Sequence, residues 1–325
     1  MIVMARTTAV RPPGWRRLLV LSPATVDFGR RGFGTEPAAT RRTLEAAAGA
    51  FLDGYHAQLG TDGAPDLSGI PPHRRGFAAE GAGMAAALLD GLRPAGVRRL
   101  PTLFAAHGDR YDYLIHVGVG WALAKLHRRG PASRDPGAPL LRWLAYDGMG
   151  FCRAFFAAEA RLRRWAARHP RRCAAGCAIR HQGLGRSLWF RACGDPDRLA
   201  GHVAAAPVAH YGDLWSGIGL AAAYAAGVPD SAYERLREVA GAHRAELAQG
   251  AAFAAEAWLR SGHVPRHAGV AVPVLTGVPT GRAAAWTWQV RRDLDRPGAD
   301  AADYQRWRLG VQRLAARAGA RVTRS

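Results

Sequence analysis

The chain has 325 residues, of which 49% are hydrophobic, and this length can bury a sizeable core in one large domain or two smaller ones. The formal charge is +20, but Lys125 is the only lysine and the arginines are scattered in pairs, so we predict no nucleic-acid binding. No run approaches the roughly 20 apolar residues that span a bilayer, and four cysteines are too few for a disulfide framework, so we expect a cytoplasmic, reduced protein.

The first half of the chain reads as helices separated by loops rich in Gly and Pro. Residues 1–24 lack periodicity and are predicted to form a mobile arm, whereas residues 25–325 are predicted to form a single helical domain. The first helix begins near Thr35 or Glu36 and includes Leu52, and a loop follows at 60–72. Further helices are expected at 78–92 and 111–127, and residues 140–168 read as one long helix or two abutting ones.

From Gln182 onward the pattern is most regular. A helix to about Cys193 is followed by a Gly-Asp-Pro turn and a second helix from Asp197. Helices at 213–227, with Asp213 as N-cap, and at 231–243 repeat this arrangement, and another unit begins at Glu246. The helix predicted at 303–318 would cap the array, and the run 270–274 is the only strand-like segment.

A short pattern recurs in these helices: a polar residue, then Gly, any residue, and Gly or Ala. Ser216-Gly-Ile-Gly is the clearest copy, Val117-Gly-Val-Gly has an apolar first position, and Ala48-Gly-Ala-Phe is a degenerate first copy. The leading glycines are separated by 30 to 37 residues; they are Gly49, Gly81, Gly118, Gly148, Gly183, Gly217 and Gly250. We predict an all-α, solenoid-like array of about seven two-helix repeats, with a period of about 34 residues and a C-terminal helical cap.

Equivalent positions of stacked repeats line up, so the polar residues before the glycines should form a ladder. One interpretation is that these groups only satisfy backbone groups or one another. The other is that they line a concave groove with aromatic side chains and bind an extended apolar ligand. The ligand-binding candidates are Glu80, His116, Trp121, Tyr146, Asp147, Gln182, Arg186, Trp189, Asp213, Trp215 and Gln249.

A possible zinc motif is weak on geometric grounds. His169, Cys173, Cys177 and His181 stand at intervals of four, but on one helix the first and last would lie about 18 Å apart and could not meet one ion. We therefore predict no metal site. The sequence has no phosphate-binding loop and no nucleophile elbow, so it leaves the cofactor and the catalytic residues unknown and leaves open whether the protein is an enzyme.

Several blocks of the sequence resemble the UnbL-type enediyne biosynthesis proteins, an actinobacterial family of unknown function. The resemblance extends over roughly residues 22–314. It rests on the segments 30–33, 75–81, 146–151, 182–190, 213–219 and 246–250. It implies a role in maturing a polyketide-derived polyene, together with partner proteins encoded nearby, and supplies no catalytic residues.

Two functions are therefore expected from the sequence. The first is an accessory or tailoring protein of enediyne or polyketide biosynthesis that binds an extended unsaturated polyketide-derived chain in an aromatic groove. The second is a non-catalytic helical-repeat scaffold that assembles other biosynthetic enzymes. A deep aromatic pocket containing the polar ladder favours the first, and a shallow open groove with charged rims favours the second.

Overall fold

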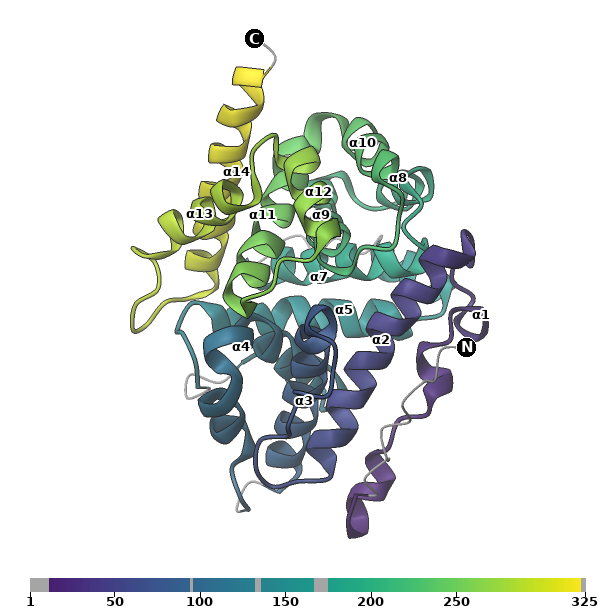
Figure 1. The fold of residues 1–325 in the computed structure, drawn as a ribbon, viewed down its shortest axis with the longest axis vertical. Coiled ribbons are helices and arrows are strands. Elements are labelled where there is room, and N and C mark those ends of the chain that lie inside the picture. Colours follow the sequence, from purple (N-terminus) through teal and green to yellow (C-terminus); the bar gives the residue numbers. More distant parts are fainter. Residues whose placement is uncertain (1–11, 94–95, 132–135, 167–174, 323–325) are drawn as a thin grey trace.

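A computed structural model describes residues 12–93, 96–131, 136–166 and 175–322. Within these ranges every regular element is a helix and no strand occurs, which confirms the all-α prediction (Figure 1). None of the described helices combines the length and apolar character needed to cross a membrane.

Seven helices form a row in which each packs against the next one in the sequence. All seven predicted glycine-bearing helices belong to this row. They are α2 (Ala38–Leu59), α3 (Pro72–Leu92), α4 (Arg99–Lys125), α5 (Leu144–Phe156), α7 (Ala175–Arg191), α9 (Tyr211–Ala225) and α11 (Arg244–Ser261). In Figure 1, α2, α3 and α4 occupy the lower half of the molecule, α5 and α7 cross its middle, and α9 and α11 lie above them.

Shorter helices form a second layer in the C-terminal half. They are α8 (Pro196–Ala204), α10 (Asp230–Val239) and α12 (Arg266–Thr276), of which α8 packs on α10 and α10 on α12. The short helix α6 (Glu159–Ala166) takes the corresponding place in the chain after α5. Short 3-10 helices at Leu141–Trp143, Val208–His210 and Gly241–His243 lead into α5, α9 and α11. Two-helix units are thus complete from α5 onward, whereas the predicted loop at 60–72 joins α2 directly to α3.

Two local predictions were wrong. The strand-like run 270–274 lies inside α12, because its valines alternate within a segment that packs as a helix on α10 and α11. Asp213 is not an N-cap: His210 holds that position and Asp213 lies in the first turn of α9. The helix predicted at 111–127 is the second part of α4, which begins at Arg99 and changes direction at Tyr111, where φ is −134° and ψ is 20°.

The recurring glycines allow neighbouring backbones to touch. A Cβ placed on Gly183 would lie 1.8 Å from the carbonyl oxygen of Asp147, and one on Gly217 would lie 1.9 Å from that of Gln182. The second glycine of each pattern faces the following helix: a Cβ on Gly150 would lie 2.0 Å from the carbonyl oxygen of Arg180. Glycine costs a helix roughly 1 kcal/mol relative to Ala, and this close backbone contact explains its recurrence here.

The first copy of the repeat lies in a different register from the predicted one. No atom lies within 4 Å of a Cβ added to Gly49, but a Cβ on Gly54 would lie 1.9 Å from the carbonyl oxygen of Ala78. In turn, Gly81 packs against the carbonyl of Phe51. Phe51, and not Ala48, therefore occupies the ladder position in α2.

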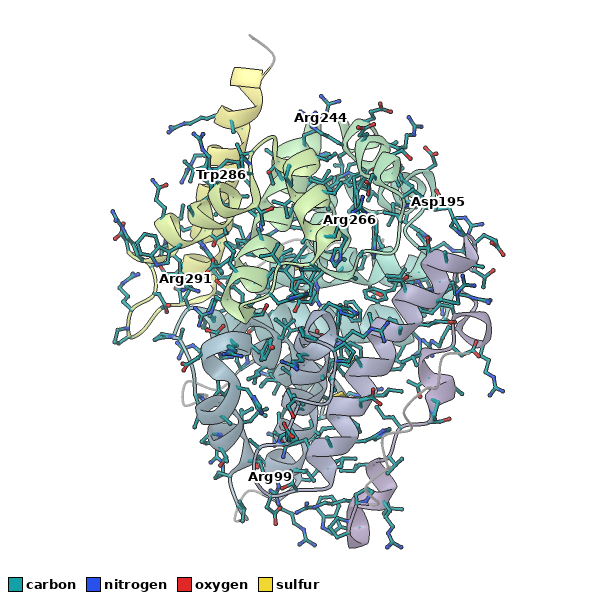
Figure 2. The ribbon with its side chains drawn as sticks, viewed as in Figure 1. Arg99, Asp195, Arg244, Arg266, Trp286 and Arg291 are labelled. Atoms are coloured by element: carbon teal, nitrogen blue, oxygen red, sulfur yellow. The ribbon has the colours of Figure 1, made fainter. Side chains whose placement is uncertain are left out.

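The row closes on itself and does not remain an open solenoid. Helix α11 contacts α4 and α2 contacts α9. The Arg260 guanidinium lies 3.0 Å from the Asp112 carboxylate, and the Phe77 and Tyr224 rings are 5.2 Å apart. Side chains fill the space between the ribbons (Figure 2). The predicted concave groove is therefore occupied by the protein's own helices.

Two C-terminal helices complete the molecule: α13 (Thr280–Arg291) and α14 (Ala301–Val322). The predicted helix at 303–318 is part of α14, which packs on α13, α11 and α7. Its Trp307 ring stacks on Phe253 of α11 at a centroid distance of 4.2 Å. Helix α14 thus covers the middle of the row as well as its end.

The N-terminal segment lies along α2 (Figure 1). Residues 1–11 fall outside the described part of the chain. The following residues form 3-10 helices at Gly14–Leu19 and Pro23–Val26 and the short helix α1 (Phe28–Arg31). The Tyr55 hydroxyl donates to the Leu19 carbonyl at 2.8 Å, and the Leu21 amide donates to His56 Nε2 at 3.2 Å. The described part of the segment 1–24 thus packs on α2.

Candidate functional site

A continuous hydrogen-bonded chain of buried polar side chains crosses the row of helices. The Gln182 amide donates to Asp147 Oδ2 at 2.7 Å, and the Ser216 hydroxyl contacts Gln182 Oε1 at 3.3 Å and Gln249 Oε1 at 2.8 Å. Helix α14 adds Gln312, whose amide donates to Gln249 Oε1 at 3.3 Å. The predicted ladder exists, but it lies in the interior. Its members hydrogen-bond to one another, although Gln249 Nε2 is buried without a hydrogen-bond partner among the described residues.

The charged end of this chain contains two carboxylates and one guanidinium. Arg186 Nη1 lies 2.5 Å from Asp147 Oδ1, and Arg186 Nη2 lies 3.6 Å from Glu80 Oε2. The Trp121 indole N–H donates to Glu80 Oε1 at 2.9 Å. All four side chains are buried. Two ionised acids facing one Arg leave one excess negative charge, which a proton on either acid neutralises.

That proton is best placed on Glu80. Burial raises the pKa of its carboxyl to about 7, and the charge of Asp147 acts in the same direction, whereas Arg186 and Trp121 lower it. A carboxyl group with a pKa near neutral pH exists in both protonation states under physiological conditions. Glu80 can therefore donate or accept a proton, which is the requirement for general acid–base chemistry.

An apolar crevice begins at this charged group. Seven aromatic side chains line it, and Glu80 and Arg186 form its polar end; the rings are those of Phe51, Phe77, Trp121, Phe151, Phe155, Phe156 and Phe190. Leu21, Thr25 and Val26 of the N-terminal segment close the other side. Its volume is about 30 Å³, room for about two water molecules. In this closed form the crevice is too narrow for a larger ligand.

A second cavity of about 30 Å³ lies beyond Arg186, between α4, α5, α9 and α11. Its lining includes the charged residues Asp147 and Arg186 and the aromatic residues Tyr113, Tyr224 and Phe253. Arg186 thus lines both cavities. Glu80 contacts the Arg186 guanidinium on the side of the crevice, and Asp147 contacts it on the side of this second cavity.

A wider, open depression of about 780 Å³ lies between α4, α5 and α6. Its lining is basic and includes Lys125, Arg153 and Arg164. It contains none of the predicted site residues. The aromatic crevice, which joins a titratable carboxyl to an apolar wall, is the stronger candidate.

Six of the predicted site residues share the polar chain or its crevice, namely Glu80, Trp121, Asp147, Gln182, Arg186 and Gln249. Others point elsewhere. The His116 ring packs on Phe104, and burial lowers its pKa to about 3. Tyr146 stacks on Trp143, and the guanidinium carbon of Arg180 lies 4.4 Å from the Tyr146 ring centroid.

The other two predicted tryptophans, Trp189 and Trp215, and Asp213 also lie outside the crevice. The Trp189 indole donates to the Ala226 carbonyl at 3.3 Å, and Trp215 is buried in the core. Asp213 pairs with Arg308 of α14 at 2.8 Å and with His210 at 3.0 Å. These three side chains hold elements together and do not share a surface with the ladder.

The sequence did not reveal the phenylalanine wall. Two patterns could have predicted it. Phe51 and Phe151 lie at or next to repeat positions, and Phe155 follows Phe151 by one helical turn. The sequence pattern also did not predict a second group of side chains. Cys177 and His181, two members of the motif with intervals of four, lie beside His210, which is supplied by another helix. The other two members, His169 and Cys173, lie outside the described residues.

The comparisons with known proteins agree with the extent of this fold. The family model described as "Protein of unknown function (DUF1702)" matches residues 14–315. The chain belongs to the DUF1702 family. No curated protein and no solved structure matches the chain. The matched range includes the N-terminal segment, the row of helices and most of α14, so the crevice and its cover both fall within the family domain.

Proposed function

We propose that this DUF1702 protein binds an extended unsaturated chain in the aromatic crevice, as an accessory or tailoring protein of polyketide biosynthesis. The observation that carries the proposal is the arrangement of the crevice: an aromatic wall ends at Glu80 and Arg186. Aromatic faces give planar conjugated chains a large contact area, and a few polar groups at one end fix the orientation of the ligand.

The polar end has the chemistry for a carboxyl or carbonyl group. The guanidinium of Arg186 is a donor for an oxygen acceptor, and protonated Glu80 is a second donor. A ligand carboxylate would compete with Asp147 and Glu80 for Arg186, so binding should be coupled to protonation of Glu80. This coupling also gives Glu80 a role as acid or base toward a bound polyene.

The resemblance to the UnbL-type proteins supports the enediyne context of the proposal. The scaffold alternative receives less support, because α11 contacts α4 and α14 packs on α11 and α7, so these faces of the row are not open to a partner protein. Partner enzymes of the same pathway would bind at the outer layer, which consists of α8, α10 and α12.

Entry of a ligand requires the crevice to widen. The N-terminal segment contributes Leu21, Thr25 and Val26 to its wall. Hydrogen bonds to α2 join Leu21 to His56, Leu19 to Tyr55 and Arg16 to the Leu59 carbonyl. We propose that this segment moves away when the chain enters. The cost of displacing it lowers the apparent affinity, as for any closed pocket.

The proposal is tested with cis-parinaric acid, a conjugated polyene carboxylic acid whose fluorescence increases in apolar surroundings. The wild-type protein should bind it, and Phe156→Ala should weaken binding about tenfold, which corresponds to ~1.4 kcal/mol of lost contact. Phe156 is half-buried, so its truncation should leave the fold intact.

The matched control is Phe104→Ala, since Phe104 is also half-buried but lies beside His116, outside the crevice. This variant should bind the probe as the wild type does. If the wild type fails to bind it, or if the two variants lose affinity equally, the crevice is not the binding site.

A further inference from the structure

Three metal-ligating side chains meet where α7 faces the start of α9. Cys177 and His181 lie one turn apart on α7, and His210 ends the 3-10 helix that leads into α9. One ligand atom from each of the three side chains lies within 4.8 Å of the other two. The His181 and His210 rings are stacked with centroids 3.5 Å apart. This group lies apart from the aromatic crevice.

Each imidazole is oriented by a hydrogen bond on its Nδ1 atom. His210 Nδ1 lies 3.0 Å from Asp213 Oδ2, and Asp213 is itself paired with Arg308. His181 Nδ1 lies 2.9 Å from the Cys177 carbonyl oxygen. Metal-binding histidines almost always carry such a bond to a carboxylate or a backbone carbonyl, because it fixes the tautomer that coordinates through Nε2.

We propose that Cys177, His181 and His210 bind a borderline divalent metal ion such as Zn²⁺. A thiolate and two imidazoles are a ligand set that Zn²⁺ accepts, and three protein ligands leave one tetrahedral position for water or an incoming ligand. The imidazole lone pairs lie in the ring planes, so binding of one ion by both rings would require at least one ring to turn out of the stacked arrangement. The ion would link α7 to α9 next to the Asp213–Arg308 pair.

The same atoms allow a different chemistry, in which Cys177 is a nucleophile, His210 its base and Asp213 the orienting acid. We favour the metal because that alternative has no use for His181. The second imidazole lies against the first and within reach of the thiol, with its Nδ1 bonded to a carbonyl. The experiment separates these two assignments.

The test uses the full-length protein with any affinity tag removed and its metal stripped by a chelator. Titration with Co²⁺ should give one equivalent of bound ion and a thiolate-to-cobalt charge-transfer band. Cys177→Ser should abolish the band, and Asp213→Asn should weaken binding about 10- to 100-fold. Cys152→Ser, which changes a buried thiol outside the cluster, should retain the band.

A second measurement on the wild type needs no variant. Bound Zn²⁺ should protect Cys177 from iodoacetamide, as located by peptide mass mapping. Absence of the band in the wild type, or its persistence in Cys177→Ser, overturns the proposal. Rapid alkylation of Cys177 that Zn²⁺ does not slow also overturns it and identifies the thiol as a nucleophile.

Discussion

Glu80 is a carboxyl group whose burial has an effect on stability that can be measured. Its pKa of about 7 lies above the ordinary value of 4.5. Between these two values the folded protein holds a proton that the unfolded chain has released. Stability must therefore fall as the pH rises through this window, by roughly 3 kcal/mol when the window is fully crossed.

Glu80→Gln removes this titration while keeping a side chain of the same shape. From pH 5 to pH 8, urea-induced unfolding of the wild type should show a loss of stability about 2 to 3 kcal/mol larger than that of the variant. The exposed Glu234→Gln should follow the wild type. Parallel pH profiles for wild type and Glu80→Gln would show that Glu80 remains ionised in the folded protein.

At the scale of the helices, the glycines decide how closely the row packs. Gly183 and Gly49 offer a matched pair, since both lie inside helices of the row. A methyl group on Gly183 would collide with the Asp147 carbonyl, whereas one on Gly49 would meet no atom within 4 Å.

Gly183→Ala should therefore destabilise the protein by about 3 kcal/mol, because neither colliding group is a flexible side chain. Gly49→Ala should stabilise it by up to ~1 kcal/mol, because alanine is the better helix former. The measurement is the midpoint of chemical unfolding for both variants at one pH. Equal effects of the two substitutions would mean that the glycines do not set the spacing of the helices.

The repeat spacing predicted the helical class, the seven helices of the row and the polar ladder along them, because each follows from short-range periodicity. It did not predict that the row closes, since closure depends on contacts such as Arg260 with Asp112 between distant helices. The same contacts explain why helices of the protein occupy the predicted concave groove. The register of the first copy was predicted wrongly, because Gly49 and Gly54 are both glycines in one helix and only their packing distinguishes them.

At the scale of the whole molecule, the polar chain, the crevice and the N-terminal segment form one unit. The helices of the row bring Glu80, Asp147 and Arg186 together from three elements. Helix α14 covers one side of the chain through Tyr304 and Gln312. The N-terminal segment covers the other end through the crevice wall. A ligand in the crevice should therefore change the dynamics of this segment and of α5 more than those of the outer layer.

Amide hydrogen exchange with and without cis-parinaric acid tests this account most directly. The prediction is that the probe changes exchange at residues 21–26, 48–52 and 151–156, and leaves α8, α10 and α12 as they are in the free protein. Changes confined to the outer layer, with none in the crevice wall, would contradict the account.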